Sequence, residues 1–406
     1  MTQIVHEILQ KAKISVITFC GRSGSIFLQS LFDGHPDIIS IPISGILQSI
    51  HKPWENDKLL DKKYALEIFD HYIPVICDAS AKITNVSKKA NKVIGLTYAE
   101  GYCPGDTLGF CSLGEGRDVV LKVDESIFRE TLHDLLRNFE KISFLEFFTI
   151  LHLAYWVSNG GEIDDLIKKE SVLILYQLHV YQVDFFQKLL EEFPKNIYHL
   201  QMVRNPIAAT GSHLVMSVKI NPDFIASQLI YRDIKTGFDY INHPRLKTIS
   251  IRLEDLHNFP EQILKNCCSW LGIEWHPTLL LSTFGSIKYW NVKDSDQVSG
   301  FNKITTSKKY DSVFSLLDIF RLKIIMREKF IIWKYQNKKY ILFTKLIDCC
   351  LFLFLSIFPY RFILKYPNKK ESRIIEHLYF SKLCFLFLIS RIFGNQPSLI
   401  DCIEIE

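Results

Sequence analysis

The sequence predicts an α/β fold built around a parallel sheet. Apolar, β-branched runs at residues 171–176, 196–203 and 247–252 predict buried strands, and amphipathic segments at residues 182–193 and 260–271 predict helices between and after them. Strands that alternate with helices are typical of a parallel sheet, and ligands of such folds bind at the carboxyl ends of the strands. Basic and polar residues at strand ends are therefore the first candidates for a functional site.

The amino-terminal part adds a strand, a short loop and a helix. Residues 14–19 form an apolar run, residues 21–25 read Gly-Arg-Ser-Gly-Ser, and residues 26–28 continue with helical spacing. A loop of this type points backbone N–H groups and a helix amino terminus at one place, where an anion can bind. Its glycines allow close backbone approach, Arg22 supplies a cation and two serines supply hydroxyl donors. The loop predicts a phosphate-type site, although an ordinary strand-to-helix turn has the same pattern.

A second candidate anion site follows the predicted strand at residues 196–203. Arg204 comes directly after this strand, and Ser212 lies about two helical turns further on. A rigid guanidinium suits bidentate phosphate binding, and the hydroxyl adds a second donor. Because the carboxyl ends of parallel strands meet at one edge of the sheet, the two sites together suggest a nucleotide with separated phosphates.

Residues 37–170 predict an insertion between strands of the sheet. Ser143 and Glu146 have the spacing of a capping box at the start of an apolar helix. Residues 119–123 predict a short strand. Six glycines within residues 95–116 predict an irregular segment, which is a lid, a surface that faces the acceptor or a plain surface loop.

The composition narrows the classes of protein. A formal net charge of +4 over 406 residues does not favour nucleic acid as a partner. The first 13 residues are mixed polar and charged, so no secretory signal is visible and a cytoplasmic location is expected. Ten cysteines include no Cys-x-x-Cys pair, which argues against a structural zinc site and favours reduced, mostly buried thiols.

Residues 311–406 predict a helical, hydrophobic extension behind a main domain at residues 1–310. Apolar runs at residues 346–360 and 383–390 are both shorter than the roughly 20 residues that a membrane-spanning helix needs. Basic residues flank each run, which favours an anchor at the membrane surface, on the inner face for a cytoplasmic protein. The alternative is a helical cap that buries these residues against the sheet or in a homodimer.

In several segments the sequence resembles PAPS-dependent sulfotransferases. Residues 21–27, and then Asp-Gly-His-Pro at residues 33–36, are similar to the loop that binds the 5′-phosphosulfate in this family. Residues 203–212 resemble the family's 3′-phosphate motif, with the arginine and the serine at the same spacing. Residues 252–256 and 268–272 are similar to its Glu-Asp-Leu and Leu-Gly segments. The resemblance implies a three-layer, P-loop-like fold and the donor 3′-phosphoadenosine 5′-phosphosulfate (PAPS), without a metal.

The resemblance also implies roles for individual residues. Arg22 would stabilise the leaving phosphate oxygen, Phe27 falls where an aromatic residue often contacts adenine, and His179 would remove the proton of the acceptor. Two residues depart from the family: Gln177 stands where cytosolic members have lysine, and Leu253 replaces a common aromatic residue. The implied nucleotide-binding residues are Gly21, Arg22, Ser23, Gly24, Ser25, Ile26, Phe27, Arg204 and Ser212.

The expected function is transfer of a sulfuryl group from PAPS to a hydroxyl or amine of a glycan, lipid or small molecule. Glu100, Glu115 and Asp124 remain alternative bases, and Lys288 could reach the 3′-phosphate. A competing function is a P-loop phosphotransferase with ATP and magnesium, which would need Gly-Lys-Ser/Thr where residues 24–26 read Gly-Ser-Ile. Another is a catalytically inactive nucleotide-binding module that associates with membranes.

Overall fold

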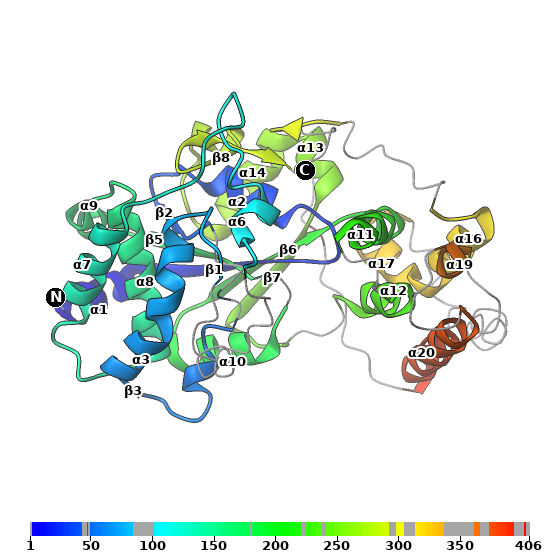
Figure 1. Ribbon diagram of the computed structural model, residues 1–406, viewed down its shortest axis with the longest axis horizontal. Coiled ribbons are helices and arrows are strands. Elements are labelled where there is room, and N and C mark those ends of the chain that lie inside the picture. Colours follow the sequence, from blue (N-terminus) through cyan, green and yellow to red (C-terminus); the bar gives the residue numbers. More distant parts are fainter. Residues whose placement is uncertain are drawn as a thin grey trace.

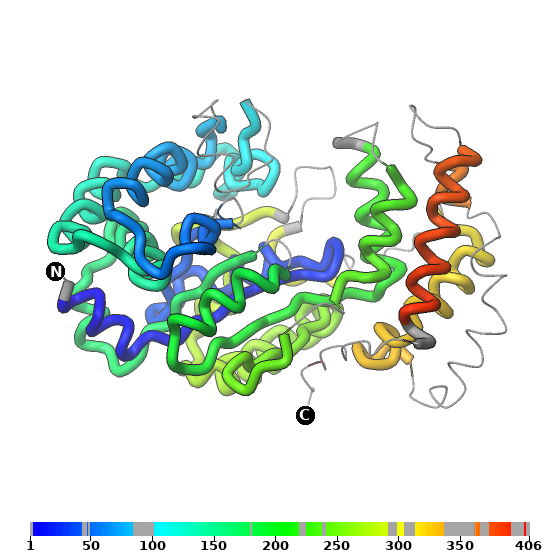
Figure 2. Tube along the Cα trace, turned by 90° about the horizontal axis from the view of Figure 1, so that it is seen from below, coloured from blue at the N-terminus to red at the C-terminus, as the bar shows by residue number. Residues whose placement is uncertain are grey.

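The computed structural model shows a central sheet with helices on both faces and a further group of helices at one end (Figures 1 and 2). The amino terminus and this group of helices lie at opposite ends of the molecule. The structure describes residues 2–42, 47, 49–83, 101–178, 181–220, 225–237, 241–291, 298–303, 313–336, 361–365, 373–393 and 402.

Five parallel strands form the sheet, in the order β2-β5-β1-β6-β7. Their bounds are β1 Ala12–Phe19, β2 Ile38–Ser40, β5 Val172–Gln177, β6 Ile197–Val203 and β7 Leu246–Arg252. Strands rich in Ile, Val and Leu suit a sheet that is covered on both faces. The predicted α/β fold with a central parallel sheet is confirmed. Because β1 is the middle strand, the loop that follows it lies between the carboxyl ends of β5 and β6.

One face of the sheet is covered by the helices next to the candidate motifs. These are α2 (Ser25–Phe32), α13 (Leu253–Asn258) and α14 (Pro260–Leu271). Alternate strand residues such as Ile17 and Leu175 point to this face and are fully buried against the three helices. The packing fixes the direction in which α2 leaves the loop.

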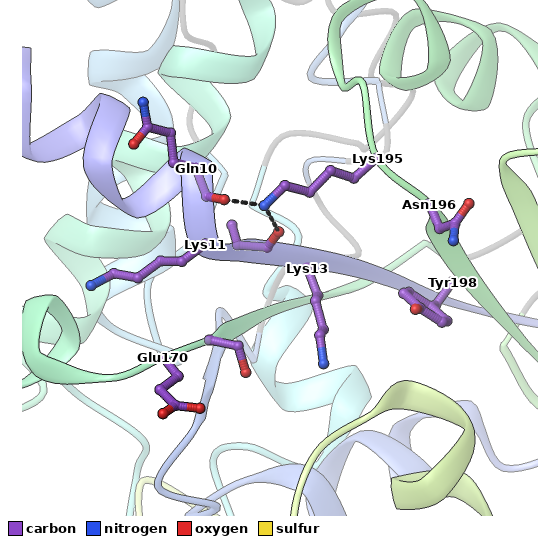
Figure 3. Close-up of a pocket in the computed structure, with 9 residues that line it drawn as sticks. Gln10, Lys11, Lys13, Glu170, Lys195, Asn196 and Tyr198 are labelled. Carbon is purple, nitrogen blue, oxygen red and sulfur yellow. Dashed lines mark hydrogen bonds between the residues drawn. The ribbon is translucent and has the colours of Figure 1, made fainter.

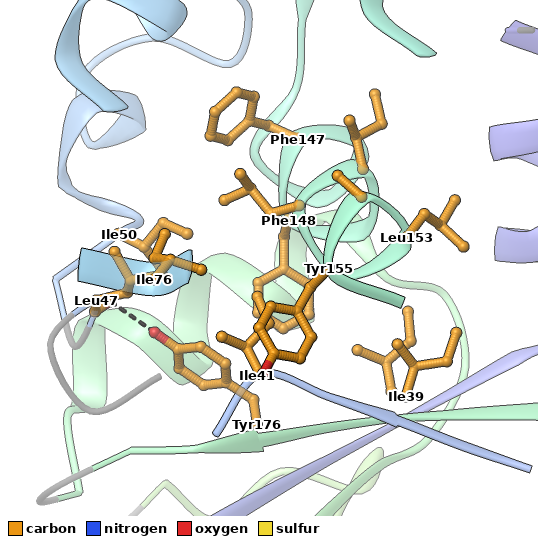
Figure 4. Close-up of a cluster of buried hydrophobic side chains, with 14 of the residues drawn as sticks. Ile39, Ile41, Leu47, Ile50, Ile76, Phe147, Phe148, Leu153, Tyr155 and Tyr176 are labelled. Carbon is orange, nitrogen blue, oxygen red and sulfur yellow. Dashed lines mark hydrogen bonds between the residues drawn. The ribbon is translucent and has the colours of Figure 1, made fainter. Parts of the chain in front are cut away.

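The opposite face is covered by the amino-terminal helix, by a helix of the insertion and by the helix that follows β5. It carries α1 (Thr2–Lys11), α8 (Phe144–Ser158) and α10 (Val183–Glu192). Figure 4 shows aromatic and aliphatic side chains of this cluster above the strands, and there the Tyr176 hydroxyl donates to the Leu47 carbonyl oxygen at 2.6 Å. With helices on both faces, the fold has three layers.

The insertion between β2 and β5 is mostly helical. The predicted capping box of Ser143 and Glu146 is confirmed at the start of α8. The predicted strand at residues 119–123 is wrong, because single residues of this segment form isolated bridges to two different parts of the chain. Residues 101–116 form one short helix and turns, and residues 95–100 lie outside the described part. The elements here are η2 Lys52–Trp54, β3 Leu60–Asp61, α3 Lys62–Phe69, η3 Asp70–Tyr72, α4 Ile73–Cys77, α6 Pro104–Leu108, α7 Glu125–Leu136, β4 Lys141–Ile142 and α9 Ile163–Lys168.

The helices after β6 lie beside the carboxyl-terminal helices (Figure 2), and a second hydrophobic core joins them. Leu214 and Ile230 pack there with Leu322 and Phe380. The predicted anchor at residues 346–360 lies outside the described part, and residues 383–390 fall within the last helix. The helices of this region are α11 Pro206–Ile220, α12 Ala226–Lys235, α16 Leu316–Ile325, α17 Arg327–Ile332, α19 Arg361–Lys365 and α20 Arg373–Phe393.

Short elements complete the described chain. They are η4 Pro277–Leu280, β8 Thr283–Phe284, β9 Ile287–Lys288, β10 Trp290–Asn291 and β11 Val298–Ser299. No disulfide joins the eight cysteines that the structure describes. In the part of the chain that the structure describes, every helix is too short or too polar to cross a membrane.

Candidate active site

The first candidate motif connects the middle strand of the sheet to α2. The loop begins at Cys20, whose backbone N–H donates to the Met202 carbonyl oxygen at 3.0 Å, and it ends at Gly24, the N-cap of α2. Gly24 makes no side-chain cap for this helix. The amino terminus of α2 therefore has no capping side chain, an arrangement that suits the predicted anion site.

Both glycines of the loop have conformations that other residues rarely adopt. Gly21 has φ of 67° and Gly24 has φ of 85°. A Cβ on Gly21 would lie 3.3 Å from the Ala209 Cβ of α11, and a Cβ on Gly24 would lie 2.7 Å from Leu253 Cδ1 of α13. The loop is thus held between α11 and α13. Its two positions need glycine because of their positive φ and because a side chain would have no room there. Leu253 supplies part of this contact.

The two serines of the loop are used differently. The Ser23 hydroxyl donates to the Met202 carbonyl oxygen at 2.7 Å, and the Ser23 backbone N–H donates to Gly21 at 3.0 Å. Ser23 therefore holds the loop to β6 in this structure. Ser25 begins α2, and its hydroxyl accepts a hydrogen bond from Gln177 Nε2 at 3.3 Å. Gln177, the last residue of β5, thus reaches the loop from the neighbouring strand.

The structure brings the second candidate motif to the first. Arg204 follows β6 directly and is 5% exposed. Its Nη1 lies 3.5 Å from the carbonyl oxygen of Arg22, in the middle of the loop. Ser212 is half-buried on α11, two turns after Arg204. A guanidinium this close to the loop adds positive charge where the predicted phosphate sites meet.

Hydrogen bonds from α13 fix the turn that carries Arg204. The Asn205 side chain accepts from the first backbone N–H groups of α11, at 3.1 and 3.3 Å. The Asn205 backbone N–H donates to Glu254 Oε1 at 3.0 Å, and the Tyr335 hydroxyl donates to Glu254 Oε2. Arg252 Nε and Nη2 donate to the two carboxylate oxygens of Asp255, at 2.5 and 2.8 Å. The Glu-Asp-Leu segment therefore positions the turn at the start of α11.

Phe27 lies inside the protein, beneath the loop. Its ring is 1% exposed, stacks on the ring of His257 at 4.8 Å and meets the edge of Phe301. This places the Phe27 side chain in the core between α2 and α13; a contact with adenine stays a prediction. Ile26, one residue earlier, is half-buried and packs against the core on the other face.

His257, which the sequence did not single out, lies next to the first motif and stacks on Phe27. Burial, and then the positive charge of Arg204, lower the pKa of His257 to about 4. Its Nδ1 accepts a hydrogen bond from the Asn302 backbone N–H at 3.0 Å, so the neutral ring carries its proton on Nε2. The signal in the sequence was its position, directly after the Glu-Asp-Leu segment and within one of the segments that resemble sulfotransferases.

The positive charge of Arg22 is felt at Tyr289, in the segment that carries β9 and β10. This charge acts on the Tyr289 hydroxyl, although burial dominates and raises the pKa of Tyr289. The Tyr289 hydroxyl donates to the Leu108 carbonyl oxygen at 3.1 Å, which joins α6 to the segment that carries β9 and β10. The charge of Arg22 thus acts near a contact between this segment and the insertion, and its catalytic role stays a prediction.

The candidate bases fall into two groups. His179 and Glu100 lie outside the described residues, so their roles stay predictions. Asp124 caps α7 by accepting two of its backbone N–H groups, and Glu115 pairs with Lys288 Nζ at 2.8 Å. Both described carboxylates thus have structural partners, and Lys288 is turned to Glu115.

A cavity of about 410 Å³ lies at the amino ends of the strands, opposite the candidate motifs (Figure 3). Residues at the amino ends of β1, β5 and β6 line it, among them Lys13, Lys195 and Tyr198. The Lys195 ammonium donates to the backbone carbonyl oxygens of Gln10 and Ala12. Because the loop at residues 20–25 lies at the carboxyl edge, this cavity is not part of the candidate active site.

Comparison with solved structures finds several similar chains, among them two sulfotransferase domains. No protein-family model matches the chain, and no curated protein matches its sequence. The sulfotransferase domain of the Synechococcus PCC 7002 olefin synthase superposes with a TM-score of 0.35 at 16% identity, over 76% of this chain and 92% of that one. The sulfotransferase domain of the curacin biosynthetic pathway gives 0.33 at 14%, over 74% and 90%. The case for a function rests on the residues of the site.

Proposed function

We propose that this protein is a PAPS-dependent sulfotransferase, with an acceptor that is a glycan, a lipid or a small molecule. The observation that carries the proposal is the contact of the two motifs, with Arg204 Nη1 3.5 Å from the Arg22 carbonyl oxygen. A glycine loop at a helix amino terminus suits the 5′-phosphosulfate, and a buried arginine beside it suits a second phosphate on the same nucleotide.

The proposed reaction is a single in-line transfer. The acceptor oxygen or nitrogen bonds to sulfur while the bond from sulfur to the bridging phosphate oxygen breaks, and 3′,5′-ADP leaves. The acceptor proton passes to a general base, for which we propose His179. Arg22 and the backbone N–H groups of the loop would stabilise the charge that develops on the leaving oxygen. Gln177 bonds Ser25 where the resembled enzymes have lysine, so Arg22 would be the main cation there.

The first experiment asks which nucleotide binds. We expect 3′,5′-ADP to raise the melting temperature more than 5′-AMP does, because only 3′,5′-ADP has the phosphate that Arg204 would bind. At a concentration of 100 Kd the gain in the free energy of unfolding is about 2.7 kcal/mol. Stabilisation by ATP with magnesium, but not by 3′,5′-ADP, would contradict the proposal and favour the phosphotransferase.

Variants assign the second motif. Arg204→Ala and Ser212→Ala should reduce the effect of 3′,5′-ADP to that of 5′-AMP. The control is Arg245→Ala, because the Arg245 guanidinium donates to the carbonyl oxygens of Phe193 and Leu190 at the amino edge of the sheet. This control should lower the melting temperature and keep the difference between the two nucleotides. If Arg204→Ala keeps that difference, the phosphate site is misassigned.

Transfer itself is tested with labelled PAPS. His179→Ala should keep the thermal response to 3′,5′-ADP and lose sulfuryl transfer to any acceptor found in a screen of lipids and glycans. A variant that remains fully active would place the base elsewhere. Nucleotide binding without transfer in the native protein, for every acceptor class, would favour the inactive binding module.

A further inference from the structure

Exposed apolar side chains gather on the carboxyl-terminal helices. Ten of the sixteen large apolar side chains that are exposed in the described part lie on α16, α19 and α20, and the other six are scattered singly. Single exposed apolar residues are normal, whereas a contiguous group marks a contact surface. In Figures 1 and 2 these helices lie at the end of the molecule away from the amino terminus.

The helix α20 has two apolar faces. Its inner face packs in the second core through Phe380, Cys384, Phe387 and Leu388, all of them buried. Its outer face is exposed, with Ile374 at 72% and Leu378 at 63%. The exposed apolar residues of α20 are Ile374, Ile375, Leu378, Tyr379, Phe385 and Leu386. At about 100° per residue these six side chains share one half of the helix circumference. We name them the outer face of α20.

The charges around the outer face are positive. Lys382 is exposed in the middle of it, Arg373 is exposed at the start of the helix, and Arg361 and Lys365 are exposed on α19. The only acidic residue of α20 is Glu376, which is fully buried and accepts the Ser227 backbone N–H at 3.1 Å. Among the described residues of α19 and α20, the exposed charge is therefore entirely basic.

We infer that the outer face of α20 docks on an anionic lipid bilayer, with the helix axis parallel to the membrane plane. Apolar side chains would enter the boundary between head groups and acyl chains, and the basic residues would meet anionic head groups. The inner face is committed to the protein core, so α20 lies on the bilayer. This surface is independent of the nucleotide site and brings the sheet to the membrane whichever acceptor is used.

The test is flotation of the full-length protein with vesicles. Wild-type protein binds vesicles of phosphatidylcholine with 30% phosphatidylglycerol and binds pure phosphatidylcholine vesicles more weakly. Leu378→Glu with Leu386→Glu weakens binding to the anionic vesicles at least ten-fold. Lys382→Gln weakens it about five-fold, as expected for one basic residue at an anionic surface. Because these side chains are exposed, the melting temperature of each variant stays close to that of the wild type.

The matched control is Leu59→Glu with Leu281→Glu. Both leucines are exposed, at 52% and 59%, and both lie away from α20. The control binds the anionic vesicles like the wild type. The inference is overturned if the wild type does not bind these vesicles, or if the α20 variant binds them as well as the control does. Light scattering that shows a dimer, turned into a monomer by the α20 variant without loss of vesicle binding, would assign the face to a second copy instead.

Discussion

Leu253 leaves no room for a side chain at Gly24 in the candidate site. A Cβ on Gly24 would lie 2.7 Å from Leu253 Cδ1, and the φ of 85° is itself unfavourable for other residues. Leu253 stands where the resembled family commonly has an aromatic residue, and here it fills the space beside a glycine. The contact couples the shape of the loop to the position of α13, so one side chain affects both motifs.

Gly24→Ala tests this contact. We expect the free energy of unfolding to fall by about 2–4 kcal/mol, from the left-handed backbone and the overpacking against Leu253. Gly160→Ala is the control, because Gly160 has φ of 88° and nothing within 4 Å of its Cβ position. The control should lose only about 1–2 kcal/mol, the cost of the backbone. Equal losses in urea unfolding would show that the contact with Leu253 yields without cost.

His199 gives a pH dependence of stability. The ring is fully buried on β6, where its Nε2 lies 2.7 Å from Thr18 Oγ1, and burial lowers its pKa to about 3. The unfolded chain takes up this proton below about pH 6.5 and the folded chain does not, so stability is lost as the pH falls through that value. Between pH 7 and pH 5 the loss from His199 is about 2 kcal/mol.

The measurement is urea unfolding at pH 7 and at pH 5. His199→Gln has no proton to take up here, so its stability should fall less over this range by about 2 kcal/mol. The comparison isolates His199 because the other titrating groups are the same in both proteins. An identical pH dependence of the two proteins would mean that His199 is protonated in the folded state as well.

At the scale of elements, the spacing of residues along the chain predicted those strands and helix ends that depend on local interactions. Apolar runs predicted the strands β5, β6 and β7, and the spacing of Ser143 and Glu146 predicted the start of α8. The segment at residues 119–123 also has the composition of a strand, but its partners are single residues from distant parts of the chain. Pairing of this kind depends on tertiary structure, which one segment does not encode.

The candidate site also contains features that the sequence predicted and contacts that it did not. The sequence located the loop and Arg204, because each follows a recognisable strand. It did not predict that Ser23 would bond Met202, or that Phe27 would stack on His257 inside the core. These contacts are made across the sheet and between helices, so they follow from packing and not from spacing along the chain.

Glu254 tests how α13 positions α11. Glu254→Ala removes the acceptor of the Asn205 backbone N–H and of the Tyr335 hydroxyl. We expect the free energy of unfolding to fall by about 1–3 kcal/mol and the affinity for 3′,5′-ADP to fall, because the turn that carries Arg204 loses its support. The control is Glu261→Ala, an exposed residue paired with Lys265, which should cost less than about 1 kcal/mol. Unchanged nucleotide affinity in Glu254→Ala would separate α13 from the site.

At the scale of the whole molecule, the carboxyl-terminal helices share a core with the candidate site. Cys20, the first residue of the loop, belongs to the same buried cluster as Val203, Phe330 and Trp333. The Tyr335 hydroxyl reaches Glu254 from this region. The boundary expected at residue 310 separates the extension from the main domain in the sequence. In the structure, side chains of the extension pack against Cys20 and Val203, next to the two motifs.

Removal of residues 311–406 should therefore destabilise the rest of the protein. The truncated chain would expose Leu214 and Ile230, which the extension now covers, so we expect a lower melting temperature, aggregation and a smaller response to 3′,5′-ADP. Trp333→Ala is the milder version and should cost about 3–5 kcal/mol. Trp275→Ala, at a half-buried position outside this core, is the control and should cost less. If residues 1–310 unfold cooperatively at the wild-type temperature and respond fully to 3′,5′-ADP, the extension is an independent unit, and the contacts of Cys20 and Tyr335 with it contribute nothing to the site.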